Sequence, residues 1–333
     1  MVTRFRLVAV QPRPPYRPDL RISRHFPDHV TIRPVVSPMS VWGRYAGIHG
    51  YICMMESIPQ GNMVDLGERG SIYVRQRSGP PGAPTVLLLH GLTATGKLNW
   101  FTSIDELATA YNVIIPDHRG HGHGLKTREP FSLEACADDA AAVLSALGVE
   151  QAVCVGYSMG GPIAQLMWAR HPEKVAGLVM CSTAARFPHA APMNLVFPFA
   201  DMFPDLLPRG APSWVPSILE KVGLGTFSEM VRHDPRALRQ AVRSLARYDG
   251  RDSISRITVP SAAVITTHDR LVPRALQEEM AGLMPACRVQ EIPADHLVCV
   301  THPKTFSHAV REACDDVVAR GMSKPSPSVG LGD

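Results

Sequence analysis

The sequence contains no long apolar run and no cysteine pattern of the kind that marks membrane, secreted or metal-binding proteins. No apolar stretch approaches the ~20 residues needed to cross a bilayer, which argues against a transmembrane helix. The basic N-terminus is followed by a single short apolar run, Leu7–Val10, which is too short for a signal peptide. The seven cysteines are scattered, odd in number and without metal-ligand spacing. We therefore expect reduced thiols, a cytoplasmic protein and no cofactor or bound metal.

The sequence also lacks an excess of one charge outside a single segment. Residues 1–44 carry eight Arg and two Asp, whereas the rest of the chain has 26 basic and 28 acidic residues. The main part therefore has no basic face for nucleic acid. The basic segment is rich in proline, and we expect residues 1–61 to form an extended or partly disordered arm. This arm is a candidate for weak contact with an anionic membrane, although a solvated tail is the simpler interpretation.

From Asn62 onward, apolar strand-like runs alternate with amphipathic helical segments. This pattern predicts an α/β fold with a doubly wound, mostly parallel sheet over residues 62–320, followed by a disordered tail at 321–333. The expected strands are Met63–Leu66, Ser71–Gln76, Thr85–His90, Val113–Pro116, Ala152–Val155, Val175–Cys181, Ala262–Thr267 and Arg288–Ile292. The expected helices are Asn99–Ala110, Ser132–Leu147, Met159–Arg170, Pro235–Tyr248, Pro273–Met284 and Pro303–Arg320.

Residues 187–252 interrupt the alternation with a segment that is both apolar and rich in proline. Its aromatic residues include Phe197, Phe199, Phe203 and Trp214. The segment is too apolar for a solvated loop and too often broken by proline for one long helix. We expect it to form a cap that packs over the strand ends.

The chemistry of the chain is indicated first by Gly156-Tyr157-Ser158-Met159-Gly160, which lies between a predicted strand and a predicted helix. This G-x-S-x-G pattern is typical of the nucleophile elbow of serine hydrolases. The glycines on either side of the serine allow the sharp turn because they carry no Cβ atom. The context predicts that Ser158 presents its hydroxyl at the carboxyl edge of the sheet.

A serine nucleophile needs a base, and the base needs an orienting acid. His296 follows the strand Arg288–Ile292, so it reaches the same edge of the sheet. Asp269 stands directly after the strand Ala262–Thr267 and is the preferred acid. Asp117 and Asp295 are the alternatives.

Three histidines lie close together at His118, His121 and His123. Their spacing allows a metal site, but no acidic or cysteine ligands are paired with them, and a metal is the less favoured interpretation.

An acyl-transfer site also needs N–H donors for the oxyanion. We expect the backbone amides of Leu92 and Met159 to supply them, since the first follows the strand Thr85–His90 and the second starts a helix. The residues expected to line the substrate pocket are Trp100, Tyr157, Phe199 and Trp214.

Taken in order, these motifs resemble the α/β-hydrolase fold family, in its branch of serine esterases and lipases with a helical cap. The resemblance rests on His90-Gly91, Asp117-x-Arg119-Gly120-x-Gly122, Ser158, Asp269 and His296. It implies that the segment 187–252 is the cap domain. Ser158 occupies the position at which the epoxide hydrolases and haloalkane dehalogenases of the family carry Asp, which argues against both activities.

The resemblance implies a serine hydrolase that cleaves a carboxylic ester or thioester of a small hydrophobic acyl substrate through an acyl-enzyme on Ser158. The alternatives are a carbon–carbon bond hydrolase, an acyltransferase, or a ligand-binding member with little turnover. The sequence does not specify the acyl chain, the alcohol or thiol, the role of the arm or the oligomeric state.

Overall fold

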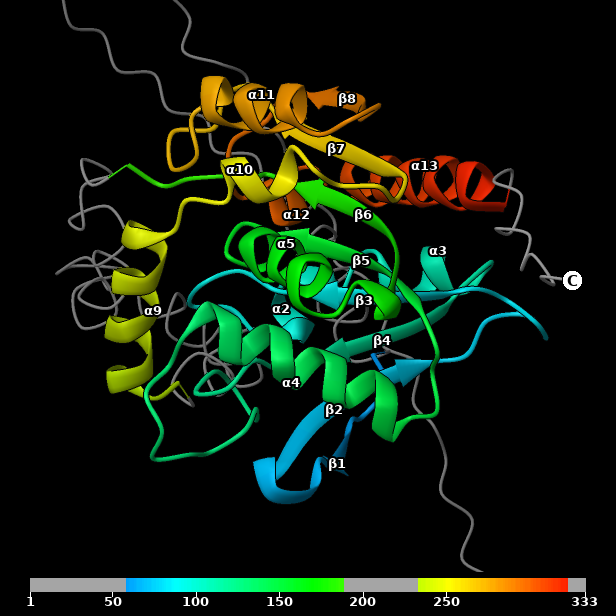
Figure 1. Cartoon of the computed structure of the whole chain (residues 1–333). Helices are drawn as coiled ribbons and strands as arrows, with labels where there is room; N and C mark the ends of the chain where they lie inside the picture. The colour runs from blue at the N-terminus through cyan, green and yellow to red at the C-terminus, as the bar shows by residue number, and fades with distance from the viewer. Residues whose placement is uncertain (1–57, 189–232, 323–333) are drawn as a thin grey trace, which may run out of the picture. The chain divides into compact units, whose positions relative to one another are not determined.

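The computed structural model describes residues 58–188 and 233–322, in which eight strands form one sheet (Figure 1). The strand order is β1-β2-β4-β3-β5-β6-β7-β8. The pairs β1–β2 and β2–β4 are antiparallel, and every other neighbouring pair is parallel. The predicted doubly wound, mostly parallel sheet is thus confirmed. The strands are β1 (Asn62–Asp65), β2 (Ser71–Arg77), β3 (Thr85–Leu89), β4 (Asn112–Pro116), β5 (Ala152–Tyr157), β6 (Val175–Cys181), β7 (Ser261–Thr266) and β8 (Arg288–Ile292).

Helices cover both faces of the sheet because the central strands are apolar on both sides. Along β3, Leu87 and Leu89 pack into one hydrophobic cluster, whereas Val86 and Leu88 pack into the other. The first cluster is covered by α4 (Leu133–Ala146), α5 (Gly160–Arg170), α10 (Arg251–Ile254) and α11 (Arg274–Leu283). The second is covered by α2 (Gly96–Trp100), α3 (Ile104–Ala108), α12 (Val298–Thr301) and α13 (Pro303–Met322). Two short 3-10 turns, η1 (Gly67–Arg69) and η2 (Pro172–Lys174), complete the connections between these elements.

The helix predicted over Asn99–Ala110 is wrong, because the structure has two short helices there. The Thr95 side chain caps the first of them by accepting a hydrogen bond from Leu98 N. A turn in which Ser103 N donates to Trp100 O then ends α2 before α3 begins. The last helix also extends to Met322, into the segment expected to be a tail, while residues 323–333 lie outside the described residues.

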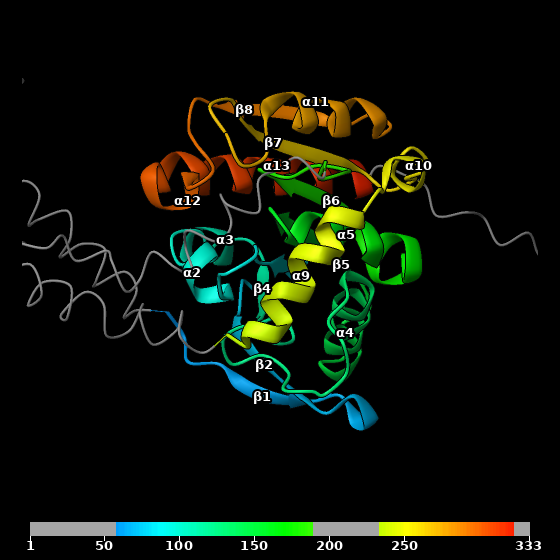
Figure 2. The same ribbon diagram turned by 90° about the vertical axis from the view of Figure 1, so that its left-hand side faces the viewer.

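Most of the expected arm and cap lie outside the described residues, which begin at 58 and omit 189–232. The two ends of the apolar segment meet, since Arg186 and Asp249 form an isolated antiparallel bridge and Gly250 N donates to Ala185 O at 2.7 Å. The helix expected near the end of this segment is present as α9 (Pro235–Arg247). In Figure 2 this helix crosses in front of the edge at which the parallel strands end.

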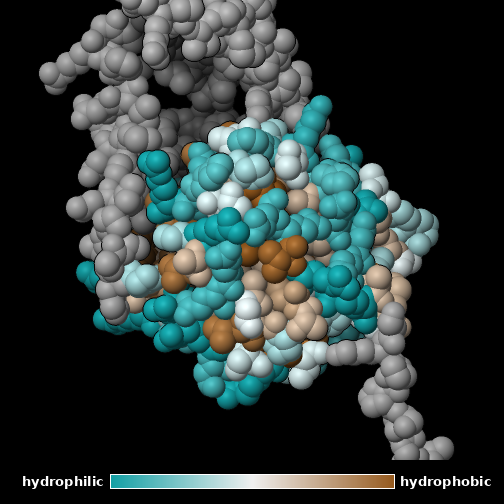
Figure 3. Space-filling model, turned by 90° about the horizontal axis from the view of Figure 1, so that it is seen from above, coloured by the Kyte–Doolittle hydropathy of each residue, from teal (hydrophilic) through white to brown (hydrophobic). Residues whose placement is uncertain are grey.

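The face over α11 and β8 is mainly hydrophilic, with small apolar patches (Figure 3). β8 is an edge strand, and its exposed charges discourage pairing with another chain. Glu291 of this strand, for example, bonds to Arg274 at 2.9 Å. Within the two described ranges, no helix is both long enough and apolar enough to span a membrane. The six cysteines in those ranges are free thiols.

Candidate active site

Ser158 lies on the sharp turn that joins β5 to α5. Its φ angle is +52°, in the left-handed region that a non-glycine residue adopts only under constraint. The turn is closely packed, since a Cβ atom on Gly156 would lie 2.3 Å from Gly160 O, and one on Gly160 would lie 2.1 Å from Leu89 O. A residue with a Cβ atom therefore does not fit at either position. The local geometry is that of a nucleophile elbow.

The structure brings Ser158, His296 and Asp269 into one hydrogen-bonded chain. His296 Nε2 lies 3.0 Å from Ser158 Oγ, and His296 Nδ1 lies 2.7 Å from Asp269 Oδ2. Because an ionised carboxylate can only accept, Nδ1 carries the imidazole proton and Nε2 is left to accept from the serine hydroxyl. The side chain of Asp269 is fully buried, whereas that of His296 is 12% exposed. The imidazole of His296 is thus partly accessible to solvent, while the carboxylate of Asp269 is shielded from water.

Five hydrogen bonds fix the carboxylate of Asp269. Oδ1 accepts from the backbone N–H groups of Leu271 at 2.9 Å and Val272 at 2.8 Å. Besides the bond from His296, Oδ2 accepts from the Thr266 hydroxyl at 2.9 Å and the Gln277 side-chain amide at 3.3 Å. Sequence reasoning did not identify Thr266 or Gln277. Gln277 is fully buried, so its amide needs polar partners, but its burial is not evident from the sequence.

The two alternative acids are engaged elsewhere. Asp117 is fully buried and accepts from Gly96 N at 2.9 Å and His123 N at 3.1 Å. Asp295 accepts from Leu297 N at 2.9 Å at the start of α12. Both carboxylates therefore hold loops at the sheet edge.

The segment expected to provide one oxyanion donor packs closely against Ser158. A Cβ atom on Gly91 would lie 3.2 Å from Ser158 Cβ, so a larger residue would push the two loops apart. Asn99 fixes this segment, because its Oδ1 accepts from Gly91 N at 2.7 Å. The backbone N–H groups of Leu92 and Met159 make no backbone hydrogen bond within the described residues. Their role as oxyanion donors stays a prediction.

The predicted pocket residues fall into two groups. Phe199 and Trp214 lie outside the described residues. Trp100 is fully buried and packs against Tyr157 and Phe306, with ring centroids 6.1 and 5.9 Å away. The Tyr157 hydroxyl, itself buried, donates to the backbone carbonyl of His296. These contacts favour core and positioning roles for Trp100 and Tyr157 over direct contact with substrate.

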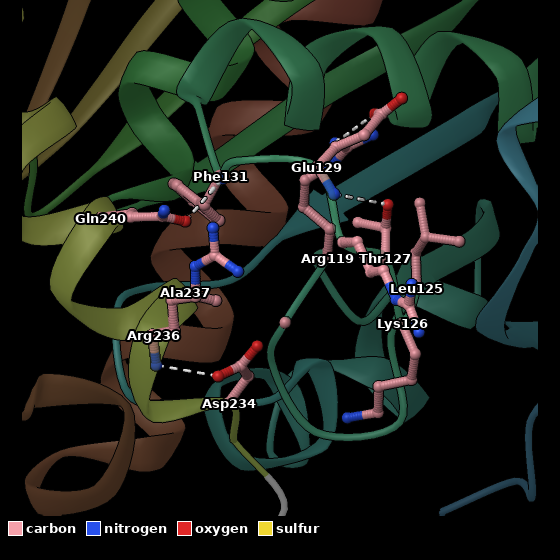
Figure 4. Close-up of a pocket in the computed structure, with 12 residues that line it drawn as sticks. Arg119, Leu125, Lys126, Thr127, Glu129, Phe131, Asp234, Arg236, Ala237 and Gln240 are labelled. Atoms are coloured by element: carbon pink, nitrogen blue, oxygen red, sulfur yellow. Dashed lines mark hydrogen bonds and ion pairs between the residues drawn. The ribbon is translucent and has the colours of Figure 1, made fainter.

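A cavity of about 80 Å³ opens between the loop after β4 and the start of α9 (Figure 4). None of Ser158, Asp269 and His296 lines it, so it is not where a substrate would meet the nucleophile. Arg119 on one wall is held by Asp139 through two bonds of 2.7 and 2.8 Å. The full lining is Arg119, Gly120, Leu125, Lys126, Thr127, Arg128, Glu129, Phe131, Asp234, Arg236, Ala237 and Gln240.

Next to Gly91 and Leu92, the segment expected to bind the oxyanion, lies a buried histidine cluster formed by His90, His118 and His121. The rings of His118 and His121 lie 4.1 and 5.5 Å from that of His90 between centroids. His90 Nε2 accepts from His118 N at 2.9 Å, so this nitrogen carries no proton. Within the described residues, no group of three or more His, Cys, Asp or Glu side chains is arranged to hold a metal ion. Burial lowers the pKa of His118 to about 3 and the pKa values of His90 and His121 well below the usual 6.5, and neighbouring imidazoles lower them further.

This cluster predicts a steep loss of stability in weak acid. The three imidazoles bind protons in the unfolded chain near pH 6.5 but stay neutral in the folded protein, so acid favours unfolding. Each is expected to lower the unfolding free energy by about 1.4 kcal/mol per pH unit, or about 4 kcal/mol together, between about pH 6 and pH 5. Urea titrations at several pH values across this range measure the slope of the unfolding free energy against pH. His308→Gln, at an exposed position, should leave it unchanged. A slope below about 1.4 kcal/mol per unit would contradict the prediction.

The comparisons with known proteins agree with this architecture. Residues 84–242 match the model of a family described as alpha/beta hydrolase fold. The pimeloyl-[acyl-carrier protein] methyl ester esterase of Chromobacterium violaceum is 31% identical over 249 residues, which are 69% of this chain and 93% of the relative. A relative from Azorhizobium caulinodans, named for carbamate hydrolysis, is 28% identical over 251 residues, covering 71% of this chain and 93% of its own. The solved structure of a thermophilic esterase from Thermogutta terrifontis superimposes with a TM-score of 0.60 at 25% identity, covering 78% of this chain and 99% of that one.

Proposed function

Because the chain belongs to the α/β-hydrolase fold family of enzymes, we propose that it is a serine hydrolase that cleaves carboxylic esters or thioesters of hydrophobic substrates. The observation that carries the proposal is the chain of hydrogen bonds from Ser158 Oγ through His296 to Asp269, at 3.0 and 2.7 Å. A serine hydroxyl held in this way can be deprotonated as it attacks, which a solitary serine cannot.

In the proposed mechanism, Ser158 Oγ attacks the substrate carbonyl carbon while its proton moves to His296 Nε2. The resulting imidazolium is stabilised by the Asp269 carboxylate on Nδ1. The negative charge that develops on the carbonyl oxygen is stabilised by the N–H groups of Leu92 and Met159. The second donor stands at the start of α5, where the helix dipole also favours negative charge.

Collapse of this intermediate releases the alcohol or thiol, which takes its proton from His296 Nε2 and leaves an acyl group on Ser158 Oγ. A water molecule then attacks the acyl carbon and gives its proton to the same nitrogen. Release of the carboxylic acid returns the proton to Ser158. The single imidazole thus serves as base and acid in both halves of the reaction.

The proposed substrate class is supported by the names of relatives and by composition. Ester hydrolysis is named for the relative from Chromobacterium violaceum and for the esterase from Thermogutta terrifontis. The apolar side chains of the 187–252 segment, those of Phe199 and Trp214 among them, would suit a hydrophobic acyl group. A carbamate is a second candidate, supported by the name of the Azorhizobium relative, since it presents a carbonyl to the same nucleophile.

The substrate class can be tested with chromogenic esters of increasing acyl length. We expect kcat/KM to rise about fourfold per added methylene until the pocket is full, because each buried methylene contributes about 0.8 kcal/mol. Phe199→Ala and Trp214→Ala should shift the best chain length without lowering the melting temperature if these side chains line the pocket. Lower stability with an unchanged profile would assign them to the core.

A panel in which no ester is cleaved would contradict the proposal. Turnover of a ring-cleavage dienoate in its place would identify a carbon–carbon bond hydrolase. Preferential transfer of the acyl group to an added alcohol would identify an acyltransferase. Binding of the esters without turnover would identify a ligand-binding member of the family.

A further inference from the structure

The exposed face of α9 carries a row of four arginines. Arg236, Arg239, Arg243 and Arg247 are all solvent-exposed, and the helix contains no acidic residue. At 100° per residue, these four positions fall within an arc of about 80° and extend over about 16 Å of the helix. We call them the arginine row. Such a narrow, uniform stripe is a local concentration of positive charge.

The helix is held so that the arginine row lies opposite its buried side, with Arg236 also lining the cavity beside the loop that follows β4. Ala237 and Ala241 are buried on the opposite side, and Asp234 N donates to Gly120 O at 2.8 Å. Gln240 Oε1 accepts from Phe131 N at 2.8 Å. These contacts tie α9 to the loop that follows β4. The direction of the arginine row is therefore set by the fold.

In the part of the chain that the structure describes, no carboxylate neutralises the arginine row. Within residues 58–188 and 233–322, none of its four guanidinium groups lies within ion-pair distance of an acidic side chain. Several exposed arginines elsewhere are paired, for example Arg256 with Asp252 at 2.8 Å and Arg274 with Glu278 at 2.7 Å. The charge of the arginine row is thus available to an external anion.

The arginine row shares its edge of the sheet with the catalytic histidine and with two exposed apolar side chains. α9 follows the end of β4 in space and α12 follows the end of β8, so both lie where the parallel strands end (Figure 2). Leu297, beside His296, is 45% exposed, and Val300 on α12 is 44% exposed. An apolar pair therefore flanks the approach to Ser158 at an edge that also bears unpaired positive charge.

We propose that this edge docks on an anionic lipid surface, with the arginine row contacting lipid phosphates and Leu297 and Val300 facing the apolar layer. Arginine suits this partner because its planar guanidinium binds phosphate through two parallel hydrogen bonds. An acidic protein would satisfy the charge but would not supply an apolar layer for the exposed side chains of Leu297 and Val300. The inference rests on the proposed function in one respect: a hydrophobic ester dissolved in the bilayer would reach Ser158 directly from this surface.

The test compares binding of the full chain to vesicles of phosphatidylcholine alone and to vesicles that also contain phosphatidylglycerol. We expect binding only with the anionic lipid, weakened by salt. Arg239→Gln with Arg243→Gln should weaken it about 30-fold, since each basic residue near such a surface contributes about 1 kcal/mol. The matched control is Arg256→Gln with Arg274→Gln, which removes the same charge at positions already paired with carboxylates. The eight arginines of residues 1–44 are present in all variants and contribute equally.

Equal binding by the two double variants would overturn the proposal, as would equal binding to both kinds of vesicle. If Arg239→Gln with Arg243→Gln abolishes binding to a polyglutamate peptide but leaves vesicle binding unchanged, the partner of the arginine row is an acidic protein. Ser158→Ala should bind vesicles as well as the original chain does. Vesicle binding by this variant separates failure of docking from failure of the proposed hydrolase activity.

Discussion

Replacing Ser158 with alanine is expected to lower kcat about 10³-fold or more while leaving the fold intact. The change removes the nucleophilic oxygen that lies 3.0 Å from His296 Nε2 and removes no bond that the fold needs, since the hydroxyl is not among the packed core groups. His296→Ala should be similarly severe, because the hydroxyl would then have no base. Steady-state kinetics with the best chromogenic ester measure both losses, and melting temperatures check the fold.

The double variant is the sharper measurement. If Ser158 and His296 act as one unit, removing both should be little worse than removing either. If the kcat losses of the two single variants multiply in the double variant, the assignment of Ser158 and His296 to one catalytic unit is contradicted. A fluorophosphonate probe adds an independent readout, since only an activated serine is phosphonylated. Labelling should disappear in Ser158→Ala and persist in Ser145→Ala, which removes a hydroxyl from helix α4.

The part of this site that depends on local pattern could be predicted from the sequence. The strand, the glycine-flanked Ser158 and the following helix are contiguous, so their arrangement follows from short-range sterics. Asp269 and His296 were identified because each follows a predicted strand, and the ends of parallel strands meet at one edge. These inferences needed only the order of elements.

The residues that sequence reasoning missed act through specific side-chain hydrogen bonds between a helix and the loop that precedes it. The Asn99 side chain accepts a hydrogen bond from Gly91 N, and the Gln277 side chain, from α11, donates one to Asp269. Neither contact leaves a trace in hydrophobic periodicity. The same limit explains the error over Asn99–Ala110, where apolar positions keep their helical spacing across a turn that breaks the backbone hydrogen bonds. Trp100 and Tyr157 were expected to line a pocket, but aromatic side chains near a site are often packed beneath it.

Asp269→Asn is expected to lower kcat about 10³- to 10⁴-fold, because an amide cannot satisfy all five donors that surround the carboxylate. If its nitrogen takes the place of Oδ2, it faces His296 Nδ1 and favours the wrong imidazole tautomer. If its nitrogen takes the place of Oδ1, it opposes the backbone N–H groups of Leu271 and Val272, at 2.9 and 2.8 Å. Neither orientation of the amide preserves both the hydrogen bonds from Leu271 N and Val272 N and the correct tautomer of His296.

The controls for this substitution use the two acids that the structure places in other contacts. Asp295→Asn should keep activity within a few-fold, because an amide oxygen can still accept from Leu297 N. Asp117→Asn should mainly lower the melting temperature, since Asp117 accepts from Gly96 N inside the core. The measurement is kcat for all three variants at equal folded concentration. Near-normal turnover by Asp269→Asn, with an inactive but folded Asp117 or Asp295 variant, would transfer the role of orienting acid to that residue. Because the five donors around Asp269 leave an amide no satisfactory orientation, we expect the loss of turnover to follow Asp269 alone.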